Sequence, residues 1–260
     1  MEEYLKGKIV LVTGAGRGIG RSIALAFGAS GSQVVVAGRN RAVLNTVAEE
    51  IRSLGAKALP LTCDVTRKEE VQFLKDKITN QLGAVQILIN DAGVAPAASF
   101  LEMEDQLWHD VLKVNLDGTY HCCKVFLPGM TASGWGRIIN IASTVAKVAY
   151  FHTAAYTTSK HAVLGLTRAL AIEMARTGVT VNAICPGYVD TELTLHNARL
   201  MAEKTGKRIE DALALFKGSS PQNRLIAPEE VADLVLMLAS NASDGITGQA
   251  INVDGGAVMV

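Results

Sequence analysis

The sequence predicts an α/β protein of the Rossmann type, a doubly wound parallel sheet of about seven strands with helices on both faces. First, short β-branched runs alternate with longer segments of helical period along the whole chain. Second, the strand-like runs are apolar almost throughout, as in strands covered on both faces. Third, the chain has 260 residues and is 49% apolar, which suffices for one large core. No internal repeat or linker divides it, so we expect a single catalytic domain over 1–260.

The alternation assigns each element a place along the chain. Strands are expected at 8–13, 33–37, 57–61, 85–89, 137–141, 180–183 and 250–253. Helices are expected near 18–29, 40–54, 67–82, 104–127, 154–176 and 228–240. The last helix is marked by Ala227-Pro228-Glu229-Glu230, because proline and acidic residues favour a first helical turn. In a sheet of this kind, ligands bind at the carboxyl ends of the strands.

One long segment, 188–227, departs from the alternation. It carries apolar residues at spacings typical of short helices, namely Leu193, Leu195, Leu200, Met201, Ile209, Leu213 and Phe216. A long insertion after a strand end more often serves function than support, although a surface hairpin without a role would show the same pattern. We therefore predict a helical substrate-binding lid within the domain.

Charge and composition exclude several classes of protein. The net charge is zero, which gives no sign of nucleic-acid binding or of an anionic membrane partner. The four cysteines form no CxxC or zinc spacing, and no histidine has metal-ligand partners nearby. The start MEEYLKGK lacks a signal-peptide pattern, and no run is apolar enough to span a bilayer. A cytoplasmic protein without a metal site is the expectation, and both an enzyme and a binding protein satisfy it.

A glycine-rich turn follows the first predicted strand. It fits the pattern TGxxxGxG through Thr13, Gly14, Gly18 and Gly20, and it does not fit GxGxxG. Because glycine lacks a Cβ atom, the backbone can approach a pyrophosphate, which then faces the free N–H groups of the next helix. A tight strand–helix turn without a ligand would contain the same glycines. Its position between a strand and a helix favours phosphate binding.

The end of the second strand indicates which dinucleotide binds. A site for unphosphorylated ribose offers an acidic residue about 20 residues after the glycine turn. This chain reads Gly38-Arg39-Asn40-Arg41 there, without an acid. A guanidinium matches the geometry and charge of a phosphate. Arg39, with help from Arg17 and Asn40, therefore predicts a preference for NADP(H) over NAD(H).

Tyr156 and Lys160 lie four residues apart in a predicted helix, so their side chains share one face. Together with TGxxxGxG, this pair resembles the short-chain dehydrogenase/reductase family. The resemblance runs almost end to end and includes Cys63-Asp64-Val65, Asn90-Asp91-Ala92-Gly93, Asn115, Ser143, Pro186-Gly187-Tyr188-Val189-Asp190-Thr191 and Val253-Asp254-Gly255-Gly256. Asp91 departs from the pattern, because the family usually has NNAG at this turn.

The resemblance implies catalytic roles for four residues. A hydride moves between nicotinamide C4 and a carbonyl carbon, while Tyr156 exchanges a proton with the carbonyl oxygen. Free tyrosine has a pKa of about 10, and an ammonium one turn away favours the phenolate. Lys160 is therefore expected to lower the pKa of Tyr156, and by resemblance it also bonds the nicotinamide ribose. Ser143 donates to the developing oxyanion, and Asn115 holds a water that connects Lys160 to solvent.

The resemblance also implies the contacts with the cofactor. Asp64 meets the adenine, and Thr191 with the backbone of Val189 holds the nicotinamide carboxamide. The cofactor-binding residues are expected to be Gly14, Arg17, Gly18, Ile19, Gly20, Arg39, Asn40, Asp64, Val65, Asn90, Ala92, Gly93, Tyr156, Lys160, Pro186, Gly187, Val189 and Thr191. A homotetramer whose long helices pair across a two-fold axis is typical of the family.

Three positions bear on the substrate. The chain resembles bacterial β-ketoacyl, acetoacetyl-CoA and polyketide ketoreductases, with 3-hydroxybutyrate dehydrogenases nearby. Those dehydrogenases bind a free carboxylate with polar side chains at positions that read Ala95, Val145 and Thr153 here. A carboxylate buried against alanine and valine would lack donors unless Lys147 or His152 supplied one.

Two further positions bear on the carrier of the substrate. Reductases that act on acyl carrier proteins place basic residues where this chain has Gly134 and Thr177, although Arg137 and Arg176 lie close by. We expect an NADP(H)-dependent oxidoreductase that interconverts a ketone and a secondary alcohol, on a β-ketoacyl thioester, a CoA thioester among them, or a polyketide-like ketone. The alternatives are an NAD-dependent 3-hydroxybutyrate or secondary-alcohol dehydrogenase, and an NADP(H)-sensing protein without catalysis.

Overall fold

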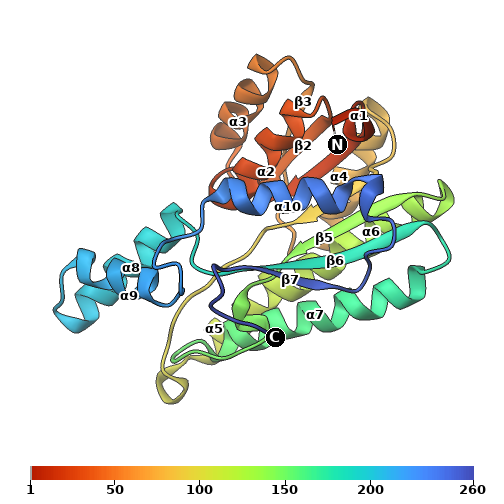
Figure 1. Cartoon of the computed structure of the whole chain (residues 1–260). Coiled ribbons are helices and arrows are strands. Elements are labelled where there is room, and N and C mark those ends of the chain that lie inside the picture. The colour runs from red at the N-terminus through yellow and green to blue at the C-terminus, as the bar shows by residue number, and fades with distance from the viewer. Residues whose placement is uncertain (1) are drawn as a thin grey trace.

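Seven parallel strands form one sheet in the computed structural model, which describes residues 2–260 and their side chains from residue 4 onward. The strand order is β3-β2-β1-β4-β5-β6-β7 (Figure 1). The strands are β1 Ile9–Thr13, β2 Gln33–Gly38, β3 Ala58–Thr62, β4 Ile87–Asn90, β5 Gly136–Ile141, β6 Val179–Pro186 and β7 Ala250–Val253. The predicted fold class is confirmed, and β6 runs three residues beyond its predicted end, to Pro186.

Helices cover both faces of the sheet. Alternate residues of β1 face opposite ways, so that Val10 packs with α2, α3 and α10 while Leu11 packs with α4, α6 and α7. The longer helices are α2 Gly18–Ala29, α3 Arg41–Ser53, α4 Lys68–Gln81, α5 Asp105–Leu112, α6 Gly118–Ala132, α7 Ala154–Met174 and α10 Pro228–Ala239. Short segments complete the order, namely α1 Glu2–Leu5 and the 3₁₀ turns Phe100–Glu102, Thr144–Ala146 and Asn241–Ser243.

The strand order reverses between β1 and β4. Thr13 and Asn90, the last residues of these two strands, are paired across the sheet. The Thr13 hydroxyl donates to the Ile89 carbonyl at 3.2 Å and accepts the N–H groups of Asp91 and Ala92. This side chain ties the two strand ends together at the switch point where doubly wound folds bind their ligands.

The helix predicted over 104–127 is two helices. Between α5 and α6 the chain makes a wide π turn at Lys113–Asp117, with Asn115 buried at its centre. The Thr119 hydroxyl bonds the Asn115 carbonyl, and Gly118 lies so close to Val65 that a Cβ atom would come within 2.6 Å of it. The sequence periodicity misses this break because the π turn is favoured by tertiary contacts and keeps the chain helical.

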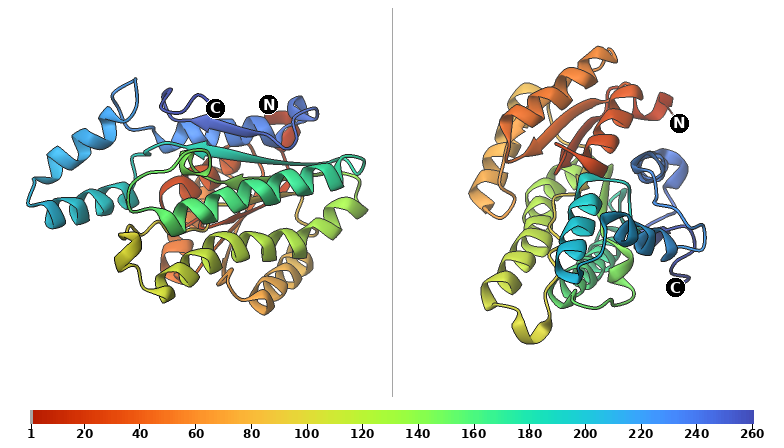
Figure 2. Two further views of the ribbon diagram at one scale, coloured as in Figure 1. Left: turned by 90° about the horizontal axis from the view of Figure 1, so that it is seen from below. Right: turned by 90° about the vertical axis from the view of Figure 1, so that its left-hand side faces the viewer.

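Two antiparallel helices project beyond the carboxyl ends of the strands, at the left of Figure 1 and in blue tones in Figure 2. They are α8 Glu192–Thr205 and α9 Ile209–Gly218, joined at Gly206, which has a left-handed φ of +68°. A small cluster of Ala198, Ala212 and Phe216 lies between them. The Phe216 ring stacks on Tyr188 with centroids 4.3 Å apart, which fixes α9 to the chain segment after β6.

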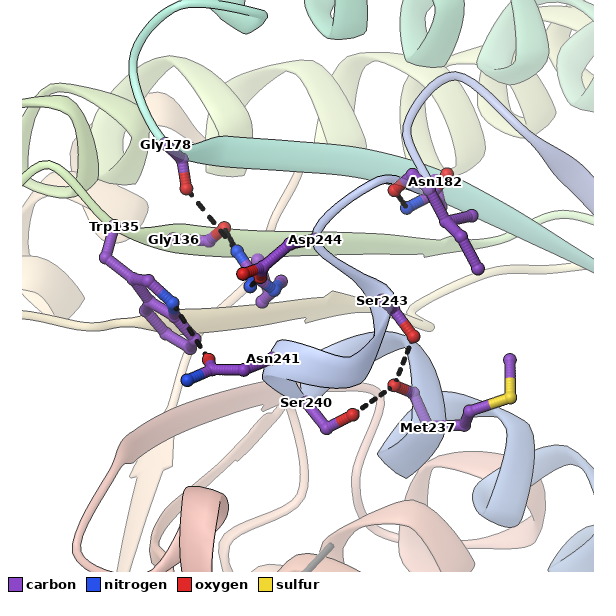
Figure 3. A network of polar contacts seen from close by, with 11 residues as sticks. Trp135, Gly136, Gly178, Asn182, Met237, Ser240, Asn241, Ser243 and Asp244 are labelled. Carbon is purple, nitrogen blue, oxygen red and sulfur yellow. Dashed lines mark hydrogen bonds and ion pairs between the residues drawn. The ribbon is translucent and has the colours of Figure 1, made fainter.

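A separate polar network closes the opposite end of the sheet, where β5 and β6 begin (Figure 3). The Arg137 guanidinium is 1% exposed, pairs with Asp244 and lies over the Trp135 ring at 4.4 Å. The Trp135 indole N–H donates to Asn241 in the turn after α10. Arg137 therefore joins α10 to the sheet, and the expectation that it belongs to a basic docking patch is wrong because its charge faces inward.

Candidate active site

A cavity of about 850 Å³ opens at the carboxyl ends of the strands. The glycine turn, the ends of β2 to β6 and the first turns of α8 contribute to its walls. Its lining includes most of the predicted site, namely Gly14, Arg17, Gly18, Ile19, Arg39, Asn40, Asp64, Val65, Ala92, Gly93, Ser143, Tyr156, Lys160, Pro186, Gly187, Val189 and Thr191. Gly20, Asn90 and Asn115 do not line it.

The glycine turn has little free space around it. Gly14 and Gly18 adopt left-handed φ angles of +69° and +54°. A Cβ atom on Gly14 would lie 2.9 Å from the Ala92 nitrogen, and one on Gly18 would lie 3.3 Å from Thr191. Helix α2 begins at Gly18 without a side-chain cap from Arg17. Its first N–H groups and the exposed backbone therefore suit the pyrophosphate of a dinucleotide.

The adenosine end of the cavity lies beside β2 and β3. Asn40 caps α3, and its side-chain oxygen accepts the N–H groups of Ala42 and Val43. Burial acts to raise the pKa of Asp64, but hydrogen bonds from Thr66 and the charge of Arg39 outweigh it and hold the pKa below its usual value. An anionic Asp64 and an exposed Arg39 thus stand together at this end.

Arg17 stands at the other side of the glycine turn. Its guanidinium approaches Glu192, the first residue of α8, at 3.9 Å. Both side chains are largely exposed, so this ion pair contributes little stability. The contact between Arg17 and Glu192 joins the glycine turn to the start of the predicted lid.

Three of the four predicted catalytic side chains converge on the cavity. Ser143 follows β5, and Tyr156 and Lys160 come from the first two turns of α7. Lys160 is 6% exposed and donates to the Ile141 carbonyl at 2.7 Å, with its ammonium 5.9 Å from the centre of the Tyr156 ring. A proton donor, a hydroxyl and a buried cation therefore meet at one wall.

The expected acidity of Tyr156 is not found in this structure. Burial raises the pKa of Tyr156 to about 12, although a side-chain hydrogen bond with Ser143 acts to lower it. Burial also lowers the pKa of Lys160 to about 8, while the nearby Asp91 charge acts to raise it. The predicted lowering of the pKa depends on the positive charge of an oxidised nicotinamide as well as on the lysine, and it left out the desolvation of the phenol.

Asn115 supports the site from the protein interior, since it is buried and does not line the cavity. Its side chain forms two hydrogen bonds with the backbone of Val94. The amide oxygen accepts the Val94 N–H and the amide nitrogen donates to the Val94 carbonyl, at 2.9 Å each. It also donates to the Ser159 hydroxyl on α7 at 2.9 Å. Both of its amide hydrogens are used, and its own carbonyl accepts Thr119. The side-chain amide therefore has no N–H left to donate to a water, and the water expected at Asn115 would have to donate to one of its carbonyl oxygens.

Asn90 is likewise a supporting residue. Its amide donates to Asn140 at 2.8 Å, and Asn140 donates to Thr167 on α7. These contacts lie in the interior, between β4, β5 and α7, and they keep the Asn90 side chain away from the cavity. The Asn90 side chain therefore supports the end of β4, and a contact of Asn90 with the cofactor, as predicted, would have to be made by its backbone.

Several lining residues were missed from the sequence. An apolar wall is formed by the missed residues Val94, Pro96, Leu107, Val111 and Val114, together with Leu193 and Leu200 of the predicted lid. Their helical spacing indicates only that one face is apolar, and core packing gives the same signal. Asp91 was missed as well, although its departure from NNAG was the available signal.

The positions that bind a carboxylate in hydroxybutyrate dehydrogenases offer no cation here. Ala95 lines the cavity, whereas Val145 is buried behind it. The Lys147 ammonium donates to the carbonyl oxygens of Ala250 and Val260, at 2.7 Å each. Lys147 is therefore held by the C-terminal segment and does not supply the missing donor.

A Rossmann-type sheet with a glycine turn at its switch point and a tyrosine–lysine pair beside a serine defines a dinucleotide-dependent oxidoreductase. The family model described as "Enoyl-(Acyl carrier protein) reductase" matches residues 14–258. The chain belongs to the short-chain dehydrogenase/reductase family.

Relatives with named activities cover almost the whole chain. The 3-oxoacyl-(acyl-carrier-protein) reductase FabG of Aquifex aeolicus is 37% identical over 98% of this chain and 99% of its own. The D-beta-hydroxybutyrate dehydrogenase of Cupriavidus necator is 34% identical over 97% of this chain and 98% of its own. A variant of actinorhodin polyketide ketoreductase, solved with NADPH, superimposes with a TM-score of 0.94 at 38% identity, over 99% of this chain and 98% of its own.

These findings establish the reaction class. The protein is an oxidoreductase that acts on ketone and CH–OH groups, and its family binds a nicotinamide cofactor. Among the described residues, no helix is long and apolar enough to cross a membrane.

Proposed function

We propose that the protein is an NADP(H)-dependent ketoreductase for an extended, largely apolar ketone, of the β-ketoacyl thioester or polyketide type. The convergence of Ser143, Tyr156 and Lys160 on the cavity that the glycine turn also enters is the observation that carries this proposal. A nicotinamide cofactor bound there supplies or accepts the hydride. The protein's own residues bind the two ligands, hold the carbonyl oxygen and move the proton.

The state of Tyr156 supports ketone reduction. The phenol carries its proton at neutral pH, as a donor to a carbonyl oxygen must, while the burial that raises its pKa to about 12 makes stabilisation of the phenolate necessary for the transfer. The Ser143 hydroxyl stands beside it as a second donor to the same oxygen. The positive charge of Lys160 favours the phenolate that the donation leaves behind.

The shape of the cavity supports the substrate class. The wall that includes Pro96, Leu193 and Leu200 is apolar, and Ala95 and Lys147 offer no partner for a free carboxylate. The lid over 188–227 contributes Leu193 and Leu200 to this wall, and its closure would exclude water from the reacting carbonyl. With Arg137 turned inward, a thioester of CoA fits the surface better than docking of a carrier protein through that residue.

The preference for NADP(H) rests on Arg39. It lines the adenosine end of the cavity, where no acidic side chain stands at the end of β2 to bond a free ribose. The similar polyketide ketoreductase solved with NADPH supports the same choice. The similarity to a hydroxybutyrate dehydrogenase keeps 3-hydroxybutyrate as the second candidate substrate.

The Tyr156→Phe variant tests the mechanism. We expect turnover of an acetoacetyl thioester with NADPH to fall by at least about a thousandfold, because the proton donor is lost while the ring remains. NADPH affinity, followed by nicotinamide fluorescence, should change less than about threefold. Retained turnover would overturn the assignment of Tyr156.

A substrate panel tests the class of substrate. It contains acyl-CoA thioesters, cyclic and bulky ketones, and acetoacetate, each with NADPH and NADH. Higher kcat/KM for thioesters or bulky ketones than for acetoacetate is expected. A preference for acetoacetate would favour the hydroxybutyrate assignment, and binding of NADPH without turnover of any compound would favour a sensor.

A further inference from the structure

Asp91 lies directly under the glycine turn. It follows β4, and its N–H and that of Ala92 donate to the Thr13 hydroxyl at 3.1 and 3.2 Å. Gly14 packs on the same backbone, since a Cβ atom on Gly14 would lie 3.1 Å from the Asp91 carbonyl carbon. The position of this residue is therefore fixed by the loop that is proposed to hold the pyrophosphate.

The Asp91 carboxyl points into the start of α2. It accepts the Gly20 N–H, one of the free donors of that helix end. A Cβ atom on Gly20 would come within 2.5 Å of Asp91 Oδ2 and within 2.6 Å of the Gly14 carbonyl oxygen. Asp91 Oδ2 and the Gly14 carbonyl oxygen thus both lie next to Gly20, which leaves no space for a side chain at that position.

The titratable groups around Asp91 come mainly from α7. Lys160 faces it and acts to lower its pKa, and the Asp91 charge in turn raises the pKa of both Tyr156 and Lys160. From β1 and α2 it meets the Thr13 hydroxyl and the backbone of Gly14 and Gly20. Burial outweighs these effects and raises the pKa of Asp91 to about 7.

We propose that Asp91 is a positioning residue that makes dinucleotide binding depend on pH, because its carboxyl must take up a proton when a pyrophosphate binds at the start of α2. This inference rests on the proposed function. The bound proton comes from solvent and not from Lys160. An anionic Asp91 would repel the two negative charges of the pyrophosphate, whereas the neutral acid holds the Gly20 N–H.

The sign of the effect follows from linkage. The cofactor binds better to the protonated carboxyl, so affinity is highest at low pH and falls as the pH rises through the pKa of Asp91 in the free protein. Between pH 6 and 8 we expect the dissociation constant to rise about fivefold, which corresponds to a pKa of about 7 in the free protein and a bound-state pKa about one unit higher. Binding at pH 7.5 should take up about half a proton.

The test compares the natural protein with Asp91→Asn. NADH is titrated by fluorescence from pH 6 to 8, because it lacks the 2′-phosphate, which titrates near pH 6 as phosphate monoesters do. The variant should bind at pH 8 about as tightly as the natural protein does at pH 6, with less than a threefold change across the range. Calorimetry in two buffers of different ionisation enthalpy measures the proton uptake, which the variant should lose.

Two further variants separate Asp91 from other sources of pH dependence. Lys160→Arg changes the dinucleotide affinity itself, because Lys160 is expected to bond the ribose, but arginine does not titrate in this range. The rise of the dissociation constant with pH should therefore persist in this variant, and its loss would assign the effect to the lysine and overturn the proposal. Asp76→Asn, on the exposed side of α4, is the control for the removal of one carboxylate. This variant should also retain the pH dependence of dinucleotide binding.

The outcomes distinguish the two proposals. Absence of binding of both NADPH and NADH by the natural protein at every pH would contradict the proposed function itself. Binding that does not vary with pH, or that varies equally in Asp91→Asn, would overturn only the role of Asp91. If the variant does not fold, proton uptake by the natural protein still decides, since binding without uptake contradicts the proposal.

Discussion

Arg39 is the residue whose charge bears most directly on the choice between the two nicotinamide cofactors. We expect Arg39→Asp to lower kcat/KM for NADPH by about tenfold to a hundredfold and to lower it much less for NADH, because a carboxylate repels the 2′-phosphate and can bond a free ribose. Steady-state kinetics with both cofactors measure the change. Arg41→Asp is the matched control, since Arg41 is exposed two residues away and does not line the cavity. Equal discrimination in both variants would refute the role of Arg39.

Burial determines the pKa values of Tyr156 and Lys160, whereas their spacing along the sequence determines only that they lie together. The separation of Tyr156 and Lys160 predicts a shared helix face, and both side chains do reach the cavity. This separation does not predict that desolvation raises the pKa of Tyr156 and lowers the pKa of Lys160. These opposite shifts depend on neighbours from other parts of the chain, Asp91 among them.

The α8–α9 pair is the element on which the proposed substrate selectivity depends. Its interior is small, and Phe216 is 6% exposed against Tyr188. Phe216→Ala should raise KM for a long acyl thioester about threefold to tenfold, with little change in NADPH affinity, because the cavity left behind loosens α9 without touching the glycine turn.

Leu215→Ala is the control for that prediction. Leu215 neighbours Phe216 on α9 but is 54% exposed, so its truncation removes little buried area. Kinetics with long and short acyl thioesters, together with thermal unfolding, measure the effect. Equal KM values for the two variants, or an equal effect on short and long substrates, would contradict a role of this element as a lid.

The outer face of α7 bears on the assembly of the whole molecule. Gly165, Ala169 and Ile172 lie on one side of the helix, all exposed, and Ile172 is 80% exposed. A stripe of small and apolar side chains lets a second helix approach closely, which supports the expected homotetramer. Tyr120 on α6 is also exposed, and it suits the same kind of contact.

A charged substitution tests this assembly. In sedimentation or light scattering we expect the natural protein to be a tetramer and Gly165→Arg to give dimers or monomers, because a guanidinium cannot be buried unpaired between two helices. A Cβ atom on Gly165 meets no atom within 4 Å, so the variant should fold. Thr79→Arg on the exposed face of α4 is the control. A monomeric natural protein, or a tetrameric Gly165→Arg, would contradict the expectation.

Local patterns in the sequence were sufficient to predict the α/β architecture. The apolar runs predicted all seven strands to within three residues at either end, and the Pro228 signal placed the start of α10. The helix break at Asn115 was not predicted, because a π turn keeps the apolar period of a helix. The inward direction of the Arg137 and Asn90 side chains was not predicted either, because a polar side chain is buried only where it meets a partner that is distant in sequence.

The sequence by itself determined the parallel α/β sheet, the glycine turn at the end of β1 and the shared face of Tyr156 and Lys160, since each depends on neighbours along the chain. Only the tertiary structure decided which of these groups meet in a cavity and in which protonation state. Those properties depend on how far water is excluded and on which charges face one another across the fold. Asp91 illustrates both, because its identity belongs to the sequence, whereas its protonation depends first on its burial and then on the ammonium of Lys160 and the backbone of α2.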